Sequence, residues 1–76
     1  MHFVLATYNT VNTGTEITIV LSSLSHIMRG TSYVDDQEVN TTWLHFHSGK
    51  SVHVNEKFEN VMADIEEYYK THRKLH

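Results

Sequence analysis

Three histidines lie close together in the second half of the chain. His45 and His47 are one residue apart, and His53 follows within the same predicted hairpin. Three neutral imidazoles can hold zinc and leave a fourth position open. No carboxylate stands beside them in the sequence to orient the rings or to act as a general base, although Glu38 and Glu56 could approach in the fold. A metal site is therefore the third interpretation of this group, behind the two that follow.

The same stretch carries the only tryptophan of the chain. Trp43 precedes His45 by two residues, so in a strand both side chains point to the same face. Such a surface can stack on a base or another ring, and aromatic residues are also enriched at protein interfaces. We rank an oligomer or protein interface first and a ligand surface second. Arg29 and Tyr33 extend this surface if the preceding strand presents them on the same side.

A β-hairpin positions these side chains. Residues 41–47 and 51–54 are its two predicted strands, and the turn between them contains Gly49, which suits a left-handed conformation. We expect His45 to face His53 across the strands. The alternate residues form the core face, and the plain reading of the other face is a solvated polar surface. The expected core residues are Leu44, Phe46, Val52 and Val54.

Four segments before the hairpin complete the sheet. Residues 2–8 are rich in β-formers and apolar on both faces, which predicts a strand covered by the helix on one side and by a second subunit on the other. Residues 16–21 alternate between apolar and polar and predict a second strand with its apolar side chains inward. Residues 22–27 break this alternation and predict a tight turn. Residues 28–34 resume an extended structure, with a bulge indicated at Gly30.

An amphipathic helix follows the hairpin. Asn55 is expected to cap it, and Glu56 and Glu59 place negative charge near its positive end. Its apolar stripe is Phe58, Val61, Met62, Ile65, Tyr68 and Tyr69. A run of strands followed by a helix predicts an α+β fold: a small antiparallel sheet of about five short strands with one C-terminal helix packed across it, in a single domain over residues 1–76.

Size and charge exclude several classes of protein. The chain has 76 residues and no cysteine, which excludes disulfides, thiolate zinc sites and thiol nucleophiles. So small a core usually needs oligomerisation or a metal to stabilise it. The net charge of −3 argues against binding duplex nucleic acid. No apolar stretch reaches the ~20 residues of a membrane span, and no signal-peptide pattern is evident, so we expect a cytoplasmic protein.

The order of these segments resembles the small flagellar proteins of the FlbD/SwrD family. The matching strings are residues 17–27, residues 42–58 with their Gly-Lys turn and Val-Asn-Glu start of the helix, and residues 65–68. The chain differs from that family in an added loop with Asp35 and Asp36 and in its histidines. The resemblance implies a small, non-enzymatic accessory or binding module.

These observations lead to one interpretation with two alternatives. We expect a non-enzymatic, homo-oligomeric binding module that holds or sequesters a small anionic ligand, such as a nucleotide, at a seam between subunits. The first alternative is an adaptor or regulatory module that binds a protein partner, and the second is a protein with a histidine-coordinated metal. We expect no catalytic residue and no cofactor. The ligand or interface residues are Arg29, Tyr33, Trp43, His45, His47 and His53.

Overall fold

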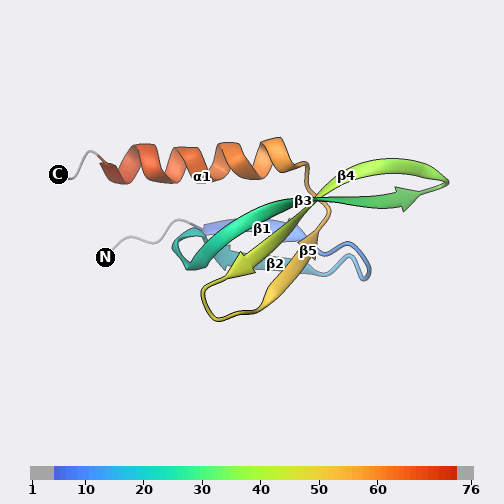
Figure 1. Cartoon of the computed structure of the whole chain (residues 1–76), viewed down its shortest axis with the longest axis horizontal. Helices are drawn as coiled ribbons and strands as arrows, with labels where there is room; N and C mark the ends of the chain where they lie inside the picture. Colours follow the sequence, from blue (N-terminus) through green and yellow to red (C-terminus); the bar gives the residue numbers. More distant parts are fainter. Residues whose placement is uncertain (1–4, 74–76) are drawn as a thin grey trace.

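The computed structural model describes residues 5–73 of the chain, and the side chains of residues 5–70. The elements, in order, are β1 (Leu5–Asn9), β2 (Glu16–Val20), the short 3₁₀ helix η1 (Leu21–Ser23), β3 (Leu24–Val34), β4 (Gln37–Phe46), β5 (Ser51–Val54) and α1 (Phe58–Arg73), as Figure 1 shows. The predicted α+β class, with five strands and a C-terminal helix, is confirmed. The strands divide into two antiparallel sheets, with strand orders β1-β2 and β3-β4-β5.

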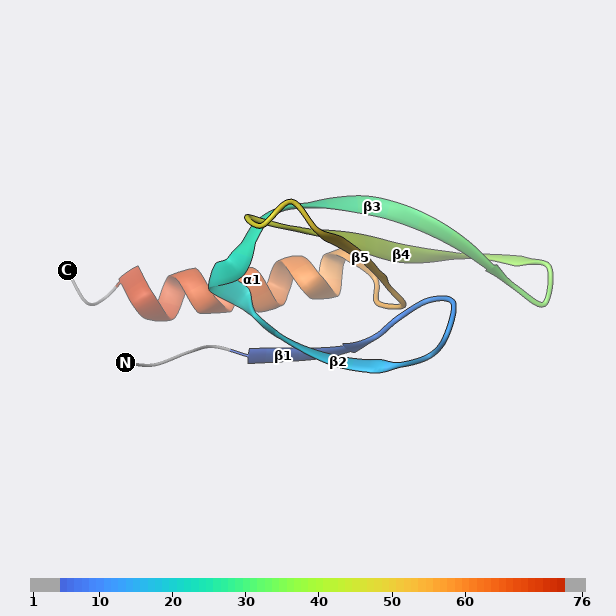
Figure 2. The same cartoon turned by 90° about the horizontal axis from the view of Figure 1, so that it is seen from below.

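The two sheets form two layers, and the helix lies along one side of both. Figure 2 shows β1–β2 and β3–β5 as separate layers, and Figure 1 shows α1 running beside them. Each layer and the helix contribute to the apolar core between them. Among the described residues, the buried core side chains are Tyr8, Ile19, Leu21, Leu44, Val54 and Val61.

The layers join where the end of β1 meets the end of β5, in a contact that we name the β1–β5 junction (residues 9–11 and 53–55). Thr10 and Val54 form an isolated antiparallel bridge. Two backbone hydrogen bonds flank it, from Asn55 N–H to the Asn9 carbonyl (2.7 Å) and from Val11 N–H to the His53 carbonyl (3.0 Å). The β1–β2 loop is thereby held against β5.

The N-terminal half differs from expectation in part. In the described part of the first strand, Tyr8 is 5% exposed and Leu5, on the other face, is 58% exposed. The single chain thus covers one face, cover of the other face by a second subunit stays a prediction, and residues 2–4 of the expected strand lie outside the described residues. The bulge indicated at Gly30 lies instead between Leu24 and His26, and Gly30 pairs regularly with β4. The predicted second strand is confirmed with its inward side chains. The turn predicted over residues 22–27 was wrong in its extent, because the short η1 ends at Ser23 and residues 24–27 already belong to β3.

The start of the helix also differs from expectation. Asn55 does not cap α1, because the extended chain continues past β5 and the Asn55 N–H bonds to β1. The helix begins at Phe58 instead. Only part of the predicted apolar stripe is buried: Val61 is fully covered, whereas Met62 and Tyr69 are 40% and 57% exposed.

Strands β3 and β4 form a long hairpin that extends beyond the core. Its turn is Asp35-Asp36, and both residues have positive φ angles (52° and 65°), as a tight two-residue hairpin turn requires. The hairpin end projects away from both sheets in Figure 1 and accounts for part of the elongated shape, 48 × 22 × 19 Å. We name residues 31–40 the β3–β4 arm. The helix found in residues 5–73 is not of the length and apolarity that crossing a membrane requires.

A buried tyrosine connects the first layer to the helix. The Tyr8 hydroxyl donates a hydrogen bond to Asp64 Oδ2 (2.6 Å). Burial, and then this hydrogen bond to a carboxylate, hold the pKa of Tyr8 far above its usual value. The ring therefore stays neutral in the folded protein at pH values where an unfolded tyrosine ionises.

We predict that Tyr8→Phe lowers the free energy of unfolding by about 1 kcal/mol at pH 7, because one hydrogen bond to a charged, solvent-accessible acceptor is lost. Since the folded pKa is raised, this contribution is present below about pH 10 and falls as the pH rises further. Urea unfolding at pH 7, 9 and 10.5 measures both effects. Asp64→Asn, which keeps an acceptor, is the control, and a constant difference between wild type and Tyr8→Phe at all three pH values would contradict the prediction.

Candidate functional site

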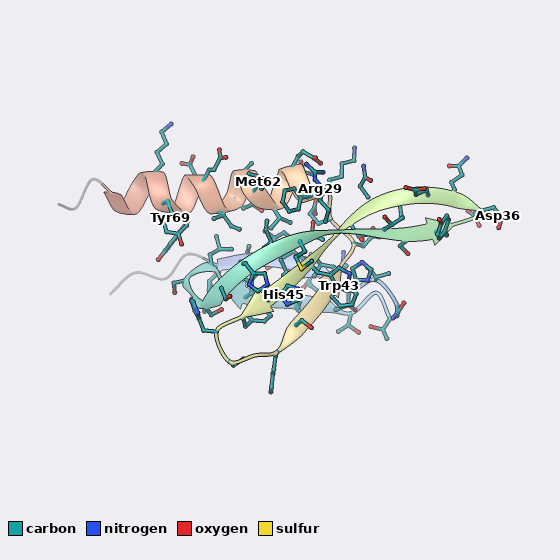
Figure 3. The ribbon with its side chains drawn as sticks, viewed as in Figure 1. Arg29, Asp36, Trp43, His45, Met62 and Tyr69 are labelled. Atoms are coloured by element: carbon teal, nitrogen blue, oxygen red, sulfur yellow. The ribbon has the colours of Figure 1, made fainter. Side chains whose placement is uncertain are left out.

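The outward face of the sheet β3-β4-β5 gathers the aromatic residues. Cross-strand partners share a face, and the pairing places Met28, Trp43 and His53 in one row and His26 beside His45 in the next. We name these five residues the outer aromatic face. Figure 3 shows Trp43 and His45 along the same sheet. The sequence predicts that Trp43, His45, His47 and His53 lie together on the face opposite the core; this is confirmed for Trp43, His45 and His53 and wrong for His47, which lies beyond the end of β4.

Trp43 and His53 form the fixed centre of this face. Their rings stack with centroids 4.2 Å apart and planes within 10°. The His53 ring also shares a hydrogen bond through Nε2 with the Thr41 hydroxyl. Burial holds the pKa of His53 below its usual value, so the ring is neutral near pH 7. Trp43 remains 38% exposed, so the stack is held rigid while part of the indole stays accessible.

Gly30 makes room for the stack. A Cβ at this position would lie 2.8 Å from Thr41 Oγ1, 2.9 Å from Trp43 Cδ1 and 3.0 Å from His53 Nε2. The rings therefore lie over the bare backbone of β3. Thr41 is completely buried beneath them, although it belongs to the outward face. The glycine that suggested a bulge is in fact a point of close packing.

Two members of the outer aromatic face were missed from the sequence. His26 stacks on His45 with centroids 4.4 Å apart and planes within 6°, and its Nδ1 is 2.7 Å from the Ser25 hydroxyl. Met28 lies opposite Trp43. Both residues follow the alternation that runs back from Gly30. The turn predicted over residues 22–27 hid His26, and the bulge expected at Gly30 left the faces of residues 28–34 unassigned.

The expected pairing across the β4–β5 hairpin was wrong by two residues. Trp43, not His45, faces His53, and His45 faces Ser51. The cause is the position of the turn: the Phe46 N–H bonds to the Lys50 carbonyl, so the three-residue turn spans residues 47–49 and not residues 48–50, and moving a turn by one residue shifts every cross-strand pair by two. The exposed His47 is therefore outside the strand.

Arg29 and Tyr33 do not extend the outer aromatic face. Arg29 pairs with buried Thr42, so it points to the helix side of the sheet, as Figure 3 shows. Its Nη1 is 2.6 Å from Glu59 Oε2 and its guanidinium lies 4.4 Å from the centre of the Phe58 ring. The same hydrogen bond lowers the pKa of Glu59. Arg29 thus docks the start of α1, while Tyr33 stands on the β3–β4 arm, 70% exposed.

The described residues give the metal alternative no support. They contain no group of three or more His, Cys, Asp or Glu side chains that could hold a metal ion. The reason is visible in the ring contacts: His45 is paired with His26, His53 with Trp43, and His47 stands apart in the turn. The three histidines that suggested a zinc site do not converge.

An open hollow of about 490 Å³ lies beside the stack, between the sheet and the β1–β2 loop. Trp43, Ser51, Val52 and His53 line one side, and residues 10–13 and Thr15 line the other. Threonine hydroxyls hold the loop in shape through contacts from Thr10 to Thr13 (2.7 Å) and from Thr13 to Thr15 (2.8 Å). The hollow therefore combines an aromatic wall with a polar rim.

A second, apolar groove of about 280 Å³ lies on the other side of the sheet, between α1 and the start of β3. Leu21, Leu24 and Ile27 line it from below, and the partly exposed Met62 and Tyr69 flank it on the helix. This groove explains why part of the predicted helix stripe is uncovered.

No protein-family model, curated protein or solved structure matches this chain. The resemblance to the flagellar FlbD/SwrD proteins therefore stays an expectation, and the site is interpreted from its own geometry.

We predict that Gly30→Ala lowers the free energy of unfolding by about 1–3 kcal/mol, because the added methyl group must displace the side chains packed over it. Displacing the indole should also shift the emission of Trp43, the only tryptophan. Chemical unfolding followed by fluorescence measures both. Thr31→Ala, at an exposed neighbouring position, is the control, and an unchanged spectrum and midpoint in Gly30→Ala would contradict the packing.

We also predict that His53 makes the protein less stable in acid. The folded pKa lies below the unfolded value of about 6.5, so below that pH the unfolded chain binds the proton more strongly and stability falls. In the His53→Gln variant, the free energy of unfolding should therefore decrease less between pH 7.5 and pH 5 than in the wild type. Urea unfolding across that range measures it, and Thr41→Val, which keeps the buried ring, should retain the wild-type slope. Equal slopes for wild type and His53→Gln would contradict the prediction.

Proposed function

We propose that this chain is a non-enzymatic binding module that works as a homo-oligomer and holds a small planar anionic ligand, such as a nucleotide, against its outer aromatic face. The observation that carries the proposal is the Trp43 ring, which is partly exposed beside the hollow and held in place by the stack on His53.

The stack supports recognition of a flat ring. An aromatic side chain fixed before binding loses little conformational entropy when a ligand arrives. Stacking a base on such a ring contributes about 1–3 kcal/mol, and every base offers a suitable face. Neutral His53 suits this role, because it packs against the indole without bringing a charge that needs solvation.

The rim of the hollow supports a polar, charged ligand of limited size. Exposed Asn12, Thr13 and Ser51 offer amide and hydroxyl groups beside the aromatic wall. Lys50 precedes Ser51 in the turn and is exposed, so it supplies a positive charge next to the rim. The net charge of −3 disfavours a long phosphate chain, which needs a broad basic surface. One or two phosphates match what the rim offers.

The small core supports self-association. The described residues bury six apolar side chains in the core, and a chain without cysteine has no disulfide to reinforce it. Among residues 5–70, seven large apolar side chains stay between 38% and 70% exposed: Leu5, Met28, Tyr33, Val34, Trp43, Met62 and Tyr69. Contact with further copies of the chain would cover part of this surface.

A specific observation favours the adaptor alternative. Tyr33 and Val34 stand on the β3–β4 arm with 70% and 51% of their surface exposed, away from the hollow. Exposed apolar groups on a projecting hairpin are typical of contact with a protein. In that case the chain would bind a protein and have no small ligand.

Calorimetric titration of the wild type with a panel of mono-, di- and cyclic nucleotides tests the proposal. We expect one class to bind and to change the Trp43 emission, and Trp43→Ala to bind it at least about tenfold more weakly, since stacking of 1–3 kcal/mol is lost. Tyr33→Ala, on the arm, is the matched aromatic control and should bind like wild type. No heat and no change in emission across the panel would overturn the ligand proposal and leave the adaptor.

A further inference from the structure

The two edges of the three-stranded sheet differ. On one edge, β5 meets β1 at the β1–β5 junction. On the other edge, β3 pairs with β4 alone within the described residues, over Leu24–Val34. The backbone groups of alternate residues along β3 therefore point outward without a neighbouring strand. Such a row of donors and acceptors is a template for a further strand.

The outer half of β3 lacks the features that normally keep an edge strand single. Residues 28–34 read Met-Arg-Gly-Thr-Ser-Tyr-Val and contain no proline and no lysine. Their one charged residue, Arg29, is turned aside to Glu59 and Phe58. The irregularity of β3 lies between Leu24 and His26, and from His26 to Val34 the pairing with β4 is regular. This stretch is long, regular and unprotected.

We propose that β3 pairs antiparallel with β3 of a second copy, about a two-fold axis at Thr31, and joins the two three-stranded sheets into one sheet of six strands. This inference rests on the proposed homo-oligomer and names the surface that forms it. The same edge serves both copies, as two-fold symmetry requires.

The register follows from the side chains that it brings together. With Thr31 opposite itself, Met28 of each copy faces Val34 of the other, and these side chains are 53% and 51% exposed in the single chain. A register centred one residue to either side would leave Met28 or Val34 without an apolar partner. The Thr31 register pairs both.

Charge complementarity supports a second copy over an unrelated strand. In this register Tyr33 faces Arg29 on the helix side of the sheet, where the guanidinium can contact a second ring beside Phe58. The acidic turn Asp35-Asp36 of each copy comes to the Arg29 end of its partner. An antiparallel partner with the same sequence thus brings opposite charges together at both ends of the contact.

The proposed dimer also fixes how the outer aromatic faces of the two copies lie relative to each other. Antiparallel pairing about an axis perpendicular to the sheet places both outer aromatic faces on the same side of the joint sheet. Two hollows would then be presented in a fixed relation by one dimer.

Cysteine cross-linking tests the register, because the chain has no cysteine of its own. In the full-length Thr31→Cys variant the two thiols meet at the axis, so mild oxidation or a short bis-maleimide at micromolar concentration should convert most of the protein to a covalent dimer. Glu38→Cys places a thiol on β4, at the opposite edge of the same arm from the proposed contact, and is the matched control that should stay mostly monomeric on denaturing gels. Equal cross-linking of the two variants would overturn the inference.

A second pair of variants tests the edge without a covalent bond. Val34→Lys puts a charge in the apolar pair and should weaken the dimer at least tenfold in sedimentation equilibrium. Leu5→Lys, at a similarly exposed apolar position on β1, should leave the dimer constant unchanged. Native emission of Trp43 in both variants shows that they are folded.

The outcomes separate this inference from the proposed function. If the wild-type protein stays monomeric up to about 100 μM, both the β3 contact and the proposed homo-oligomer are overturned. An oligomer that survives Val34→Lys and does not cross-link through Thr31→Cys overturns only the β3 contact. Nucleotide titration of Val34→Lys tests ligand binding independently of both.

Discussion

The structure depends on the short contact where the end of β1 runs beside the end of β5. It is small, consisting of one bridge and two flanking hydrogen bonds, yet it sets the spacing of the two layers. It places Tyr8 under the helix, where the buried hydroxyl reaches Asp64. It also holds Val11 against His53, which brings the β1–β2 loop beside the aromatic stack and forms the hollow. The core and the candidate site are therefore consequences of the same contact, and a change that separates the layers affects both.

The outer aromatic face depends on a position in β3, Gly30, that has no side chain. Glycine in a strand costs conformational entropy and contributes no packing of its own. At Gly30 this cost is offset because Trp43, His53 and the buried Thr41 pack over the bare backbone. The result is a flat pair of rings with one neutral, half-buried histidine and one accessible indole. On the other face of the same strand, Arg29 fixes the start of the helix. Strand β3 thus separates a surface that holds the fold from a surface that is free to bind.

Alternation and helical spacing predicted the number and order of the strands and the helix and most of the buried positions, although they missed the first residues of β3 and β4. The inward residues of β2, the core positions Leu44 and Val54, and the helix residue Val61 all follow from period alone. The period of the pattern does not determine the register in which two strands pair. The turn after Phe46 spans residues 47–49 where residues 48–50 were predicted, and this displacement by one residue moved the partner of His53 from His45 to Trp43. The division into two sheets and the side taken by Arg29 depend on contacts between residues far apart in the chain, which local sequence does not encode.

The difference between the two edges of the larger sheet limits how the protein can assemble. A chain with two open edges would add copies without end, whereas here β5 is occupied by the contact with β1. In the proposed dimer, pairing through β3 about a two-fold axis would use up this edge in both copies. The other stretches with an open side among the described residues are short: β2 has five residues and carries Glu16 and Thr18 outward, β1 meets β5 only past its end, and residues 37–41 of β4 extend beyond β5. Short, polar edges of this kind resist further pairing. The same topology that leaves β3 available therefore favours a closed dimer over a filament.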